Sequence, residues 1–404
     1  MTVTAAPKSR EFVLAALCLL LGATLVPAES LPQPHYSPVT PGLDYAHLVI
    51  TNQPWSIHIA RLERSRPDFD ILTTLGKGTI QGLSSLSDEV RSVLRESGKP
   101  IAAVNGDFFL IRPGPYQGDP EGLQIINGEL VSTPGPLSFW VERRQLHIEK
   151  VLSAMGIIWP GGRENPLGLN QTPHADGAVL FTPIFGPSTR ATNMVEVVLE
   201  RAGTNAWLPL RAGQKYSARV RSINPSGDTP LQPDIAVLTV GSDLTNHLGA
   251  VEPGDFGRHS AAVEPGDILQ ISTALSKDLS KATTAIGGGP VLVHGGKAQE
   301  WPAQKGTNTY LLPRHPRTAL GFNPRYFFLV EVDGRQKELS MGMTFAELAS
   351  FMKTIGCAEA MNLDGGGSST FWLNGKVMNS PSDKHERGLA NAVVIVQKTK
   401  PPRK

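Results

Sequence analysis

The chain has 404 residues, which is enough for one large domain or two ordinary ones. Hydrophobic residues make up 40% and charged residues 18%, a balance typical of a globular protein rather than a disordered one. The formal net charge of +2 gives no electrostatic reason to expect a nucleic-acid partner or an acidic membrane. High counts of glycine (41) and proline (33) favour many turns and a strand-rich fold.

The N-terminus has the pattern of a signal peptide. Lys8 and Arg10 form a basic region, an apolar run follows over residues 12–26, and small residues precede a cleavage point after Ala28. We therefore predict a signal peptide over residues 1–28 and an exported protein, periplasmic or extracellular, without a stable membrane anchor. The alternative is a retained anchor, for which the apolar run is short.

The first part of the mature chain alternates extended and helical patterns. A Pro-rich lead-in over residues 29–43 precedes strand-like alternation from His47 onward, in which His58 is predicted as a sheet residue rather than a ligand. Apolar residues at helical spacing predict a helix over residues 83–97, with Ser87 as its N-cap. A buried strand over residues 101–104 then enters the turn at Asn105.

Further strands and hairpins fill the centre of the chain. Asn127-Gly128, Gly295-Gly296 and Asn374-Gly375 are turn signals of two-residue hairpins. Apolar or alternating runs predict strands over 178–181, 195–199, 218–223, 235–240, 318–322, 327–332 and 392–396.

A second helix is predicted near the C-terminus. Thr344 and Glu347 form a capping box, apolar residues recur on one stripe, and Gly356 ends the helix. Cys357 follows and would be the only cysteine left after signal cleavage; we predict a small core residue rather than a nucleophile.

These elements predict an α+β fold, with one large mixed β-sheet, a few helices and a single main catalytic domain. The expected organisation is the signal peptide over 1–28, a lead-in with the first strands and helix over 29–97, and the catalytic domain over 98–398.

Two glycine loops follow short apolar runs, one at residues 286–290 and one at residues 364–369. Successive glycines let backbone N–H groups converge on an anion or a sugar. Neither loop binds nucleotides in the known ways, because a Rossmann fingerprint needs glycine where Thr370 stands and a Walker loop needs lysine before serine or threonine. The alternative is a tight turn required by packing.

Acidic and basic side chains accompany these loops. Asp107, Glu121, Asp333 and Asp364 each lie at or just past the end of a predicted strand, where carboxyl groups can converge on one cleft. Turn formation is the competing explanation for each of them.

Two arginines complete the set of charged candidates. Arg317 opens a strand and Arg387 lies in a polar loop before another, and the planar guanidinium suits phosphate oxygens. Surface salt bridges are the alternative. The ten histidines are scattered, without a HExxH helix or a Cys/His cluster, so no cofactor is expected and the metal ligands remain unknown. A divalent cation held by aspartates and backbone oxygens is left open.

Taken in order, these motifs resemble the phosphodiester glycosidase family, over roughly residues 98–398. The resemblance rests on Asn105 to Phe109, Glu121-Gly122, Ile286 to Pro290, Arg317 to Gly321, Val332 to Arg335, Asn362 to Ser369, Pro381 to Asp383, Arg387 and Asn391-Ala392.

The resemblance implies hydrolysis of the bond between a sugar's anomeric carbon and a phosphodiester, with an N-acetylhexosamine-like sugar. For an exported chain, cell-wall or exopolysaccharide phosphodiesters are the expected partners. The implied catalytic residues are Asp364, Glu121 and Arg317. The implied substrate-binding residues are Asn105, Asp107, Gly288, Gly289, Asp333, Asn362, Gly365, Gly366, Ser368, Ser369, Asp383 and Arg387.

Within this scheme Arg317, Arg387 and the loop N–H groups hold the phosphate, because a phosphate leaving group needs little protonation. Asp364 activates water or stabilises an oxocarbenium-like sugar, with Glu121 as the second carboxylate. Asn105 and Asp107 hold sugar hydroxyls or the acetamido group.

Two other functions stay open. A non-catalytic module that binds cell-wall polysaccharide would be favoured by exposed aromatic residues, for which Trp140, Trp301 and Trp372 are the candidates, although core positions also suit them. A metal-dependent phosphodiesterase would cut the bond on the other side of phosphorus, and the lack of a His/Asp ligand motif counts against it.

Overall fold

A computed structural model describes residues 32–204, 206–245, 263–300 and 313–398. The predicted signal peptide, residues 1–28, and Trp301 lie outside these ranges. Within them, no helix is both long enough and apolar enough to cross a membrane.

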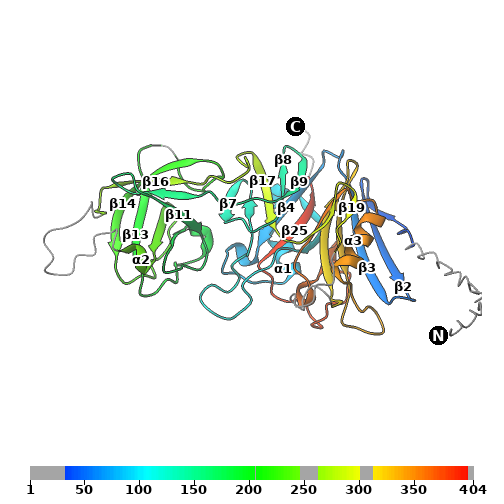
Figure 1. The fold of residues 1–404 in the computed structure, drawn as a ribbon. Coiled ribbons are helices and arrows are strands. Elements are labelled where there is room, and N and C mark those ends of the chain that lie inside the picture. Colours follow the sequence, from blue (N-terminus) through cyan, green and yellow to red (C-terminus); the bar gives the residue numbers. More distant parts are fainter. Residues whose placement is uncertain (1–31, 205, 246–262, 301–312, 399–404) are drawn as a thin grey trace, which may run out of the picture. The chain divides into compact units, whose positions relative to one another are not determined.

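The largest sheet has eight strands, all antiparallel, and joins the first three strands of the chain to strands from residues 291–362 (Figure 1). In spatial order its strands are β1 (Ser37–Thr40), β2 (Leu43–Ile50), β3 (Trp55–Glu63), β21 (Tyr326–Val332), β20 (Arg317–Phe322), β22 (Glu359–Asn362), β18 (Val291–His294) and β19 (Lys297–Ala298). Residues 37–63 therefore pair directly with strands from the glycine-loop half of the chain.

Two five-stranded antiparallel sheets carry the other loops of interest. The first runs β7 (Glu129–Ser132), β6 (Gln124–Ile126), β17 (Ala282–Gly287), β8 (Ser138–Glu142) and β9 (Gln145–Glu149). The second runs β24 (Lys376–Val377), β23 (Phe371–Leu373), β5 (Lys99–Asn105), β25 (Asn391–Gln397) and β4 (Phe69–Leu75). β17 ends in the first glycine loop, and β23 begins just after the second.

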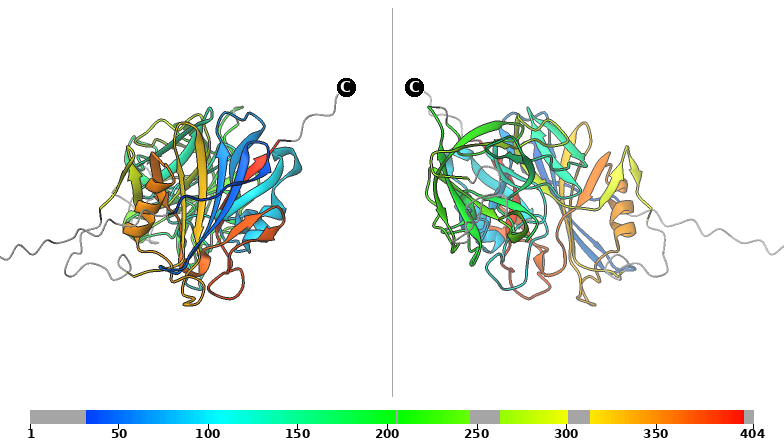
Figure 2. Two further views of the ribbon diagram at one scale, coloured as in Figure 1. Left: turned by 90° about the vertical axis from the view of Figure 1, so that its right-hand side faces the viewer. Right: turned by 60° about the vertical axis from the view of Figure 1, so that its left-hand side comes forward.

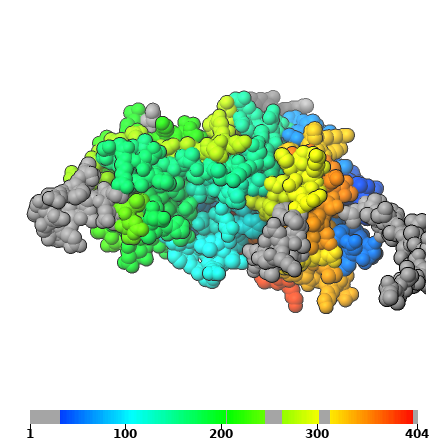
Figure 3. All heavy atoms as spheres, in the orientation of Figure 1, coloured from blue at the N-terminus to red at the C-terminus, as the bar shows by residue number. Residues whose placement is uncertain are grey.

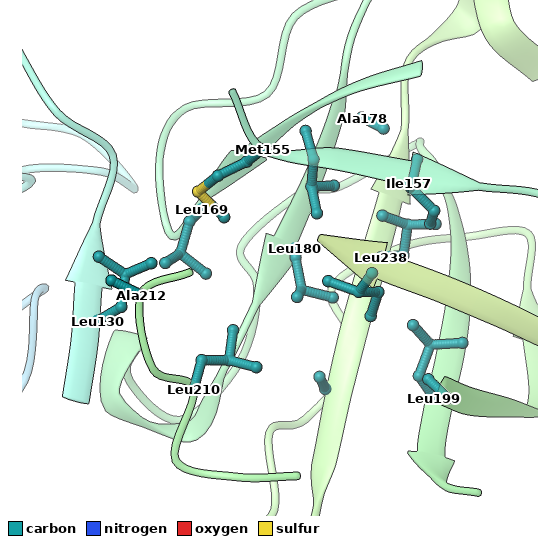
Figure 4. Close-up of a cluster of buried hydrophobic side chains, with 14 of the residues drawn as sticks. Leu130, Met155, Ile157, Leu169, Ala178, Leu180, Leu199, Leu210, Ala212 and Leu238 are labelled. Carbon is teal, nitrogen blue, oxygen red and sulfur yellow. The ribbon is translucent and has the colours of Figure 1, made fainter. Parts of the chain in front are cut away.

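Residues 156–272 include a closed seven-stranded barrel, drawn in green in Figure 1. Its strands in order are β10 (Gly156–Ile158), β11 (Glu164–Leu169), β12 (Ala178–Phe181), β15 (Ile235–Val240), β13 (Val195–Arg201), β14 (Lys215–Asn224) and β16 (Ile268–Ser272). All pairs are antiparallel except β11 with β12. Leu169, Leu180, Leu199 and Leu238 fill its interior (Figure 4).

Helices are few and short in the described residues. They are α1 (Leu86–Ser92), α2 (Ser242–Thr245), α3 (Phe345–Thr354) and the 3-10 turns η1 (Gly76–Gly78), η2 (Arg95–Ser97), η3 (Pro183–Phe185) and η4 (Gly366–Ser368). The capping box of Thr344 and Glu347 is confirmed, and α3 packs beside β18 and β19 (Figure 2).

The predicted helix over 83–97 is too long. The α-helix covers only Leu86–Ser92, and its N-cap is Ser85, whose side chain accepts a hydrogen bond from the backbone N–H of Asp88 at 3.1 Å. Ser87 lies inside the first turn instead. The chain then leaves helical geometry at Val93 and forms η2. Both serines are capable caps, and the choice between them depends on which apolar face the core accepts.

The fold is mostly β with few helices, and the prediction of one large mixed sheet is wrong. Four separate sheets, one of them closed, share the strands, and nearly every pair is antiparallel. The predicted strands and all three hairpins are confirmed, with positive φ at both central residues of each turn. Periodicity identifies strands, whereas long-range packing decides which strands pair.

The described residues form several separate apolar clusters around these sheets. One apolar cluster joins the barrel to β6, β7, β8 and β17, and a second fills the space between the eight-stranded sheet and both five-stranded sheets. Trp140 and Trp372 are only 4% and 8% exposed, so these two indoles belong to the core rather than to a binding surface. Cys357 is a buried core residue as predicted, and burial raises the pKa of its thiol.

Candidate active site

Asn105, at the end of β5, ties three elements together behind the second glycine loop. Its Nδ2 donates to the backbone oxygen of Asp364 at 2.7 Å, and its Oδ1 accepts hydrogen bonds from Thr318 Oγ1 at 2.7 Å and Thr370 N at 3.1 Å. The side chain is completely buried. All of these hydrogen bonds go to the protein itself, and they position the loop that carries Asp364. The sequence had predicted that Asn105 contacts the sugar.

Asp107 lies two residues further on and is held in a narrow slot. Its backbone N–H donates to Asn391 Oδ1 at 2.8 Å, and its Oδ1 accepts from Phe108 N at 2.8 Å. Its Oδ2 is buried and has no hydrogen-bond partner among the described residues. A Cβ on Gly287 would lie 2.2 Å from that oxygen and one on Gly122 2.6 Å, so both glycines are needed for the carboxyl group to fit.

The carboxyl groups of Asp107, Glu121 and Asp364 influence one another. Burial raises the pKa of Asp107 to about 8, and the negative charges of Glu121 and Asp364 add to that rise. Burial also raises the pKa of Asp364 to about 6, although hydrogen bonds from Ser368 and Gly365 N and the charge of Arg387 lower it. Glu121 itself is exposed. The structure therefore brings three predicted acids from distant segments into one electrostatic cluster.

Arg387 approaches this cluster together with Asp383. Nε and Nη2 of Arg387 donate to Asp383 Oδ2 at 3.0 and 2.7 Å, and Nη1 lies 3.5 Å from Ser368 Oγ. A Cβ on Gly367 would lie 2.0 Å from Arg387 Nη2, so the ion pair sits directly against the glycine loop. Both side chains are 30% exposed, which leaves the guanidinium accessible.

Arg317 lies on the other side of the same loop and is 6% exposed. Its Nε donates to the backbone oxygen of Met343 at 2.9 Å, its Nη2 to that of Pro313 at 3.2 Å, and the guanidinium stacks 3.9 Å above the ring of Phe345. Burial, with the nearby charge of Arg335, lowers the pKa of Arg317 to about 10, so it stays cationic at neutral pH. Its guanidinium therefore contributes a buried positive charge beneath the loop and is not exposed for direct contact with a ligand.

The remaining loop residues divide between the surface and the interior. Gly365 N donates to Asp364 Oδ1 at 2.7 Å, and a Cβ on Gly366 would lie 2.9 Å from the exposed Arg335. Ser368 and Ser369 are buried at 0% and 1%. The Oγ of Ser369 accepts from Thr318 Oγ1 at 3.3 Å, so this hydroxyl faces the sheet.

The first glycine loop is pinned to the second through Asn362. The N–H of Gly289 donates to the Asn362 oxygen at 2.8 Å, and Asn362 Nδ2 donates to the Gly289 oxygen at 2.9 Å. Asn362 is 1% exposed and therefore links the loops from behind. A Cβ on Gly288 would lie 2.6 Å from Met361 Cε, which explains the glycine there by packing.

Asp333 is not among the groups at the cavity. It is 1% exposed, its Oδ2 accepts from Ser56 Oγ at 2.8 Å, and its Oδ1 accepts from Ser380 N at 2.8 Å. These hydrogen bonds place Asp333 inside the eight-stranded sheet, where it holds the segment around Ser380. A residue that contacts substrate would face solvent instead.

Two cavities that share Glu121 border this cluster, one at Asp107 and Glu121 and the other at Glu121 and Asp119. The smaller, about 160 Å³, is lined by Asp107, Phe108, Glu121, Gly122, Gly135, Pro136, Leu137 and Gly288. The larger, about 560 Å³, is lined by Leu110, Asp119, Pro120, Glu121, Ser132, Thr133, Leu169, Gln171, Thr172 and His174. Glu121 lines both cavities. The loop that contributes Leu110 to the larger cavity belongs to the cyan part of the surface in Figure 3.

Several residues of the site could not be predicted from any sequence motif. Asp119 lies among turn residues, yet burial and the charge of Glu121 raise its pKa to about 7, and its Oδ1 has no partner among the described residues. Asn391 holds the backbone of Asp107 and is itself held by Gln124 Oε1 at 2.9 Å. Such neighbours become visible only when residues 284 apart in sequence meet.

The site combines acids of graded acidity, glycine loops and a cation, as expected of a hydrolase acting on a sugar derivative. Comparison with known proteins agrees with this class. The sequence profile of the phosphodiester glycosidase family, a family of hydrolases, matches residues 218–396, and the chain is similar to that family over this part of its length.

Individual relatives are distant and partial. The SPbeta prophage-derived uncharacterized protein YomE of Bacillus subtilis is 37% identical over 94 residues, 23% of this chain and 14% of YomE. N-acetylglucosamine-1-phosphodiester alpha-N-acetylglucosaminidase of Bos taurus is 33% identical over 109 residues, 26% of this chain and 20% of the bovine protein. The chain thus matches a fifth or less of the length of these curated relatives.

One solved structure, a candidate exported protein of Burkholderia pseudomallei, has the same general fold. It superposes with a TM-score of 0.65 at 22% sequence identity, covering 86% of this chain and 75% of that one.

Proposed function

We propose that this chain is an exported glycosidase that hydrolyses the bond between the anomeric carbon of an N-acetylhexosamine-like sugar and a phosphodiester. The carboxyl cluster carries the proposal. Asp107 and Asp364 have pKa values near 8 and 6, so one is protonated and the other ionised at neutral pH. Acids separated in this way can act as proton donor and base within one site.

In the proposed reaction, each of the acids and arginines of the site has one role. Water attacks the anomeric carbon and gives a proton to ionised Asp364, while the carbon–oxygen bond breaks and the phosphate leaves with the electron pair. Arg387, beside the loop, stabilises the charge on the leaving phosphate, and Arg317 adds positive potential from below. Protonated Asp107 donates a hydrogen bond to the sugar or the leaving oxygen. Glu121, at the junction of both cavities, stabilises the developing positive charge on the sugar ring.

The cavities suggest how a larger substrate would lie. We place the sugar in the 160 Å³ cavity beside Asp107 and the remainder of the phosphodiester in the 560 Å³ cavity, whose polar lining includes Ser132, Gln171 and His174. Polar walls favour a hydrophilic partner such as a cell-wall or exopolysaccharide chain over a lipid. This is consistent with export, and one structural neighbour is itself a candidate exported protein.

The decisive experiment is hydrolysis of an α-N-acetylglucosaminyl phosphodiester, with a panel of other sugar phosphodiesters, in water enriched in heavy oxygen. We expect free sugar carrying the heavy oxygen, which marks cleavage at the anomeric carbon. Label on phosphate instead would mean a phosphodiesterase. No turnover of the panel by folded protein, with retained binding of polysaccharide, would favour the binding module.

Variants locate the chemistry in the proposed residues. Asp364→Asn should lower kcat by about 100-fold or more, the scale of a lost proton-transfer group. Glu121→Gln should lower kcat by a similar factor, because it removes the charge that stabilises the sugar ring. Arg387→Ala should lower kcat/KM by a similar factor. The matched controls Asp234→Asn and Glu96→Gln change exposed carboxylates and should retain full activity. Full activity of Asp364→Asn would remove this residue from the mechanism.

A further inference from the structure

A second group of titratable side chains lies inside the eight-stranded sheet, away from both cavities. It consists of His58 on β3 and Glu331 and Asp333 on and just after β21. His58 and Glu331 are direct partners across the two strands, and Asp333 N donates to the Ser56 oxygen at 3.0 Å. Residues two apart in a strand share a face, so all three side chains meet on one side of the sheet.

The group is buried and lacks a compensating cation. His58, Glu331 and Asp333 are 2%, 0% and 1% exposed. Neither Oε1 nor Oε2 of Glu331 has a hydrogen-bond partner in the described residues, and no lysine or arginine there forms an ion pair with it. The amide of Asn379 donates to Ser369 O at 3.1 Å and Asp333 Oδ1 at 3.4 Å, and it also lies close enough to Glu331 to favour the ionised form of that carboxyl group.

Orphaned buried carboxylate oxygens are costly, because burial strips their hydration without replacing it. Protonation of Glu331 relieves the charge but still leaves two buried polar atoms unpaired. A bound cation relieves both at once.

The geometry of His58 fits a metal ligand. Its Nδ1 lies 2.7 Å from Tyr45 Oη, and its Nε2 lies 3.6 Å from Asp333 Oδ2. Donation of Nδ1–H to the tyrosine oxygen turns the Nε2 lone pair toward the two carboxyl groups, the arrangement that metal-bound histidines adopt. One ligand atom from each of the three residues lies within 4.8 Å of the others.

We propose that His58, Glu331 and Asp333 bind one divalent cation of the zinc class. One imidazole nitrogen and two carboxylate oxygens form a ligand set that suits zinc better than calcium or magnesium, which prefer oxygen alone. A tetrahedral site needs ligand atoms about 3.3 Å apart, from metal–ligand distances of about 2.0 to 2.1 Å, so small side-chain shifts close the site, and a water molecule would supply the fourth ligand.

The bound ion would brace the second glycine loop from behind. Asp333 Oδ1 accepts from Ser380 N, and Asn379 bridges Asp333 to the backbone oxygen of Ser369 in the loop. Because the site is buried, the ion would not reach substrate, and the three ligands are positioning residues. This inference is independent of the proposed hydrolysis.

The test is elemental analysis of the purified full chain after dialysis without chelator. We expect about one zinc-class ion per chain, loss of that ion and a lower Tm after treatment with a strong chelator, and recovery with Zn²⁺ but not Mg²⁺ or Ca²⁺. Co²⁺ added to the stripped chain should give the intense visible absorption of a tetrahedral nitrogen and oxygen site.

Variants decide whether these residues hold the ion. Glu331→Gln and His58→Asn should each weaken metal affinity at least 10-fold, whereas the control His294→Gln, an exposed histidine paired with Glu359, should keep it. Absence of metal together with no Tm shift on adding Zn²⁺ overturns the proposal, as does full affinity in both variants. If the variants fail to fold, X-ray absorption of the metal in the unaltered chain decides, since a shell without imidazole refutes the site.

Discussion

Replacement of Asp107 by asparagine should stabilise the protein relative to the wild type, and this difference in stability should grow as the pH rises. Burial raises the pKa of this carboxyl from its ordinary value of 3.8 to about 8 in the folded chain, so folding keeps the proton that the unfolded chain releases. The contribution of Asp107 to stability is therefore fully present below pH 3.8 and lost as the pH rises to about 8.

The magnitude of this stability difference follows from the one proton that the folded chain holds and the unfolded chain releases. Each pH unit in that window weakens the wild-type fold by about 1.4 kcal/mol relative to a chain that cannot ionise there. Asp107→Asn should gain about 5 kcal/mol relative to the wild type between pH 4 and pH 8, and no more above it. The asparagine can still accept the hydrogen bond of Phe108 N through its Oδ1.

The assay is denaturant unfolding of both proteins at pH 5, 6, 7 and 8, with Asp234→Asn as the control at an exposed aspartate. Other buried acids, such as Asp119 and Asp364, contribute the same sign to both proteins, so the difference between the two reports Asp107 together with its coupling to Asp364. A difference that does not change with pH would refute a raised pKa at this position.

Three further predictions concern the same fold. If Asp364 acts as base and Asp107 as donor, kcat/KM should peak between pH 6 and 8, and a profile still rising above pH 9 would contradict these roles. Gly287→Ala should destabilise the chain by about 1 to 3 kcal/mol, measured by chemical denaturation, because its methyl group meets Asp107 Oδ2, whereas Gly114→Ala meets no atom within 4 Å and should be neutral. Cys357 should resist thiol reagents until the protein unfolds, as peptide mass spectrometry can show.

Local structure could be predicted from the sequence because its causes are local. The hairpin at Asn127-Gly128 and the capping box of Thr344 depend on residues that touch within four positions, and both are confirmed. The helix start at Ser85 could not be chosen over Ser87 in the same way, since the core decides which register buries Leu86 and Val90.

The site was predictable as a set of residues but not as an arrangement. Motif order selected Asp107, Glu121 and Asp364, and the structure places them in one cluster. It could not separate groups at the cavity from groups behind it, because Asn105 and Asp333 have the same strand-end, turn-like sequence context as Asp107. Which strand end faces solvent depends on how four sheets pack, and that information is spread over the whole chain.

The carboxyl cluster itself helps to choose between an enzyme and a binding module. A module that recognises neutral polysaccharide needs hydrogen-bonding groups, which asparagine, glutamine or serine supply without opposing the fold. Here Asp107, Asp119 and Asp364 all have raised pKa values and therefore weaken the folded state at neutral pH. Selection for stability alone would replace them with neutral residues. Acids in such surroundings support the proposed proton transfer, which needs a proton held near neutral pH.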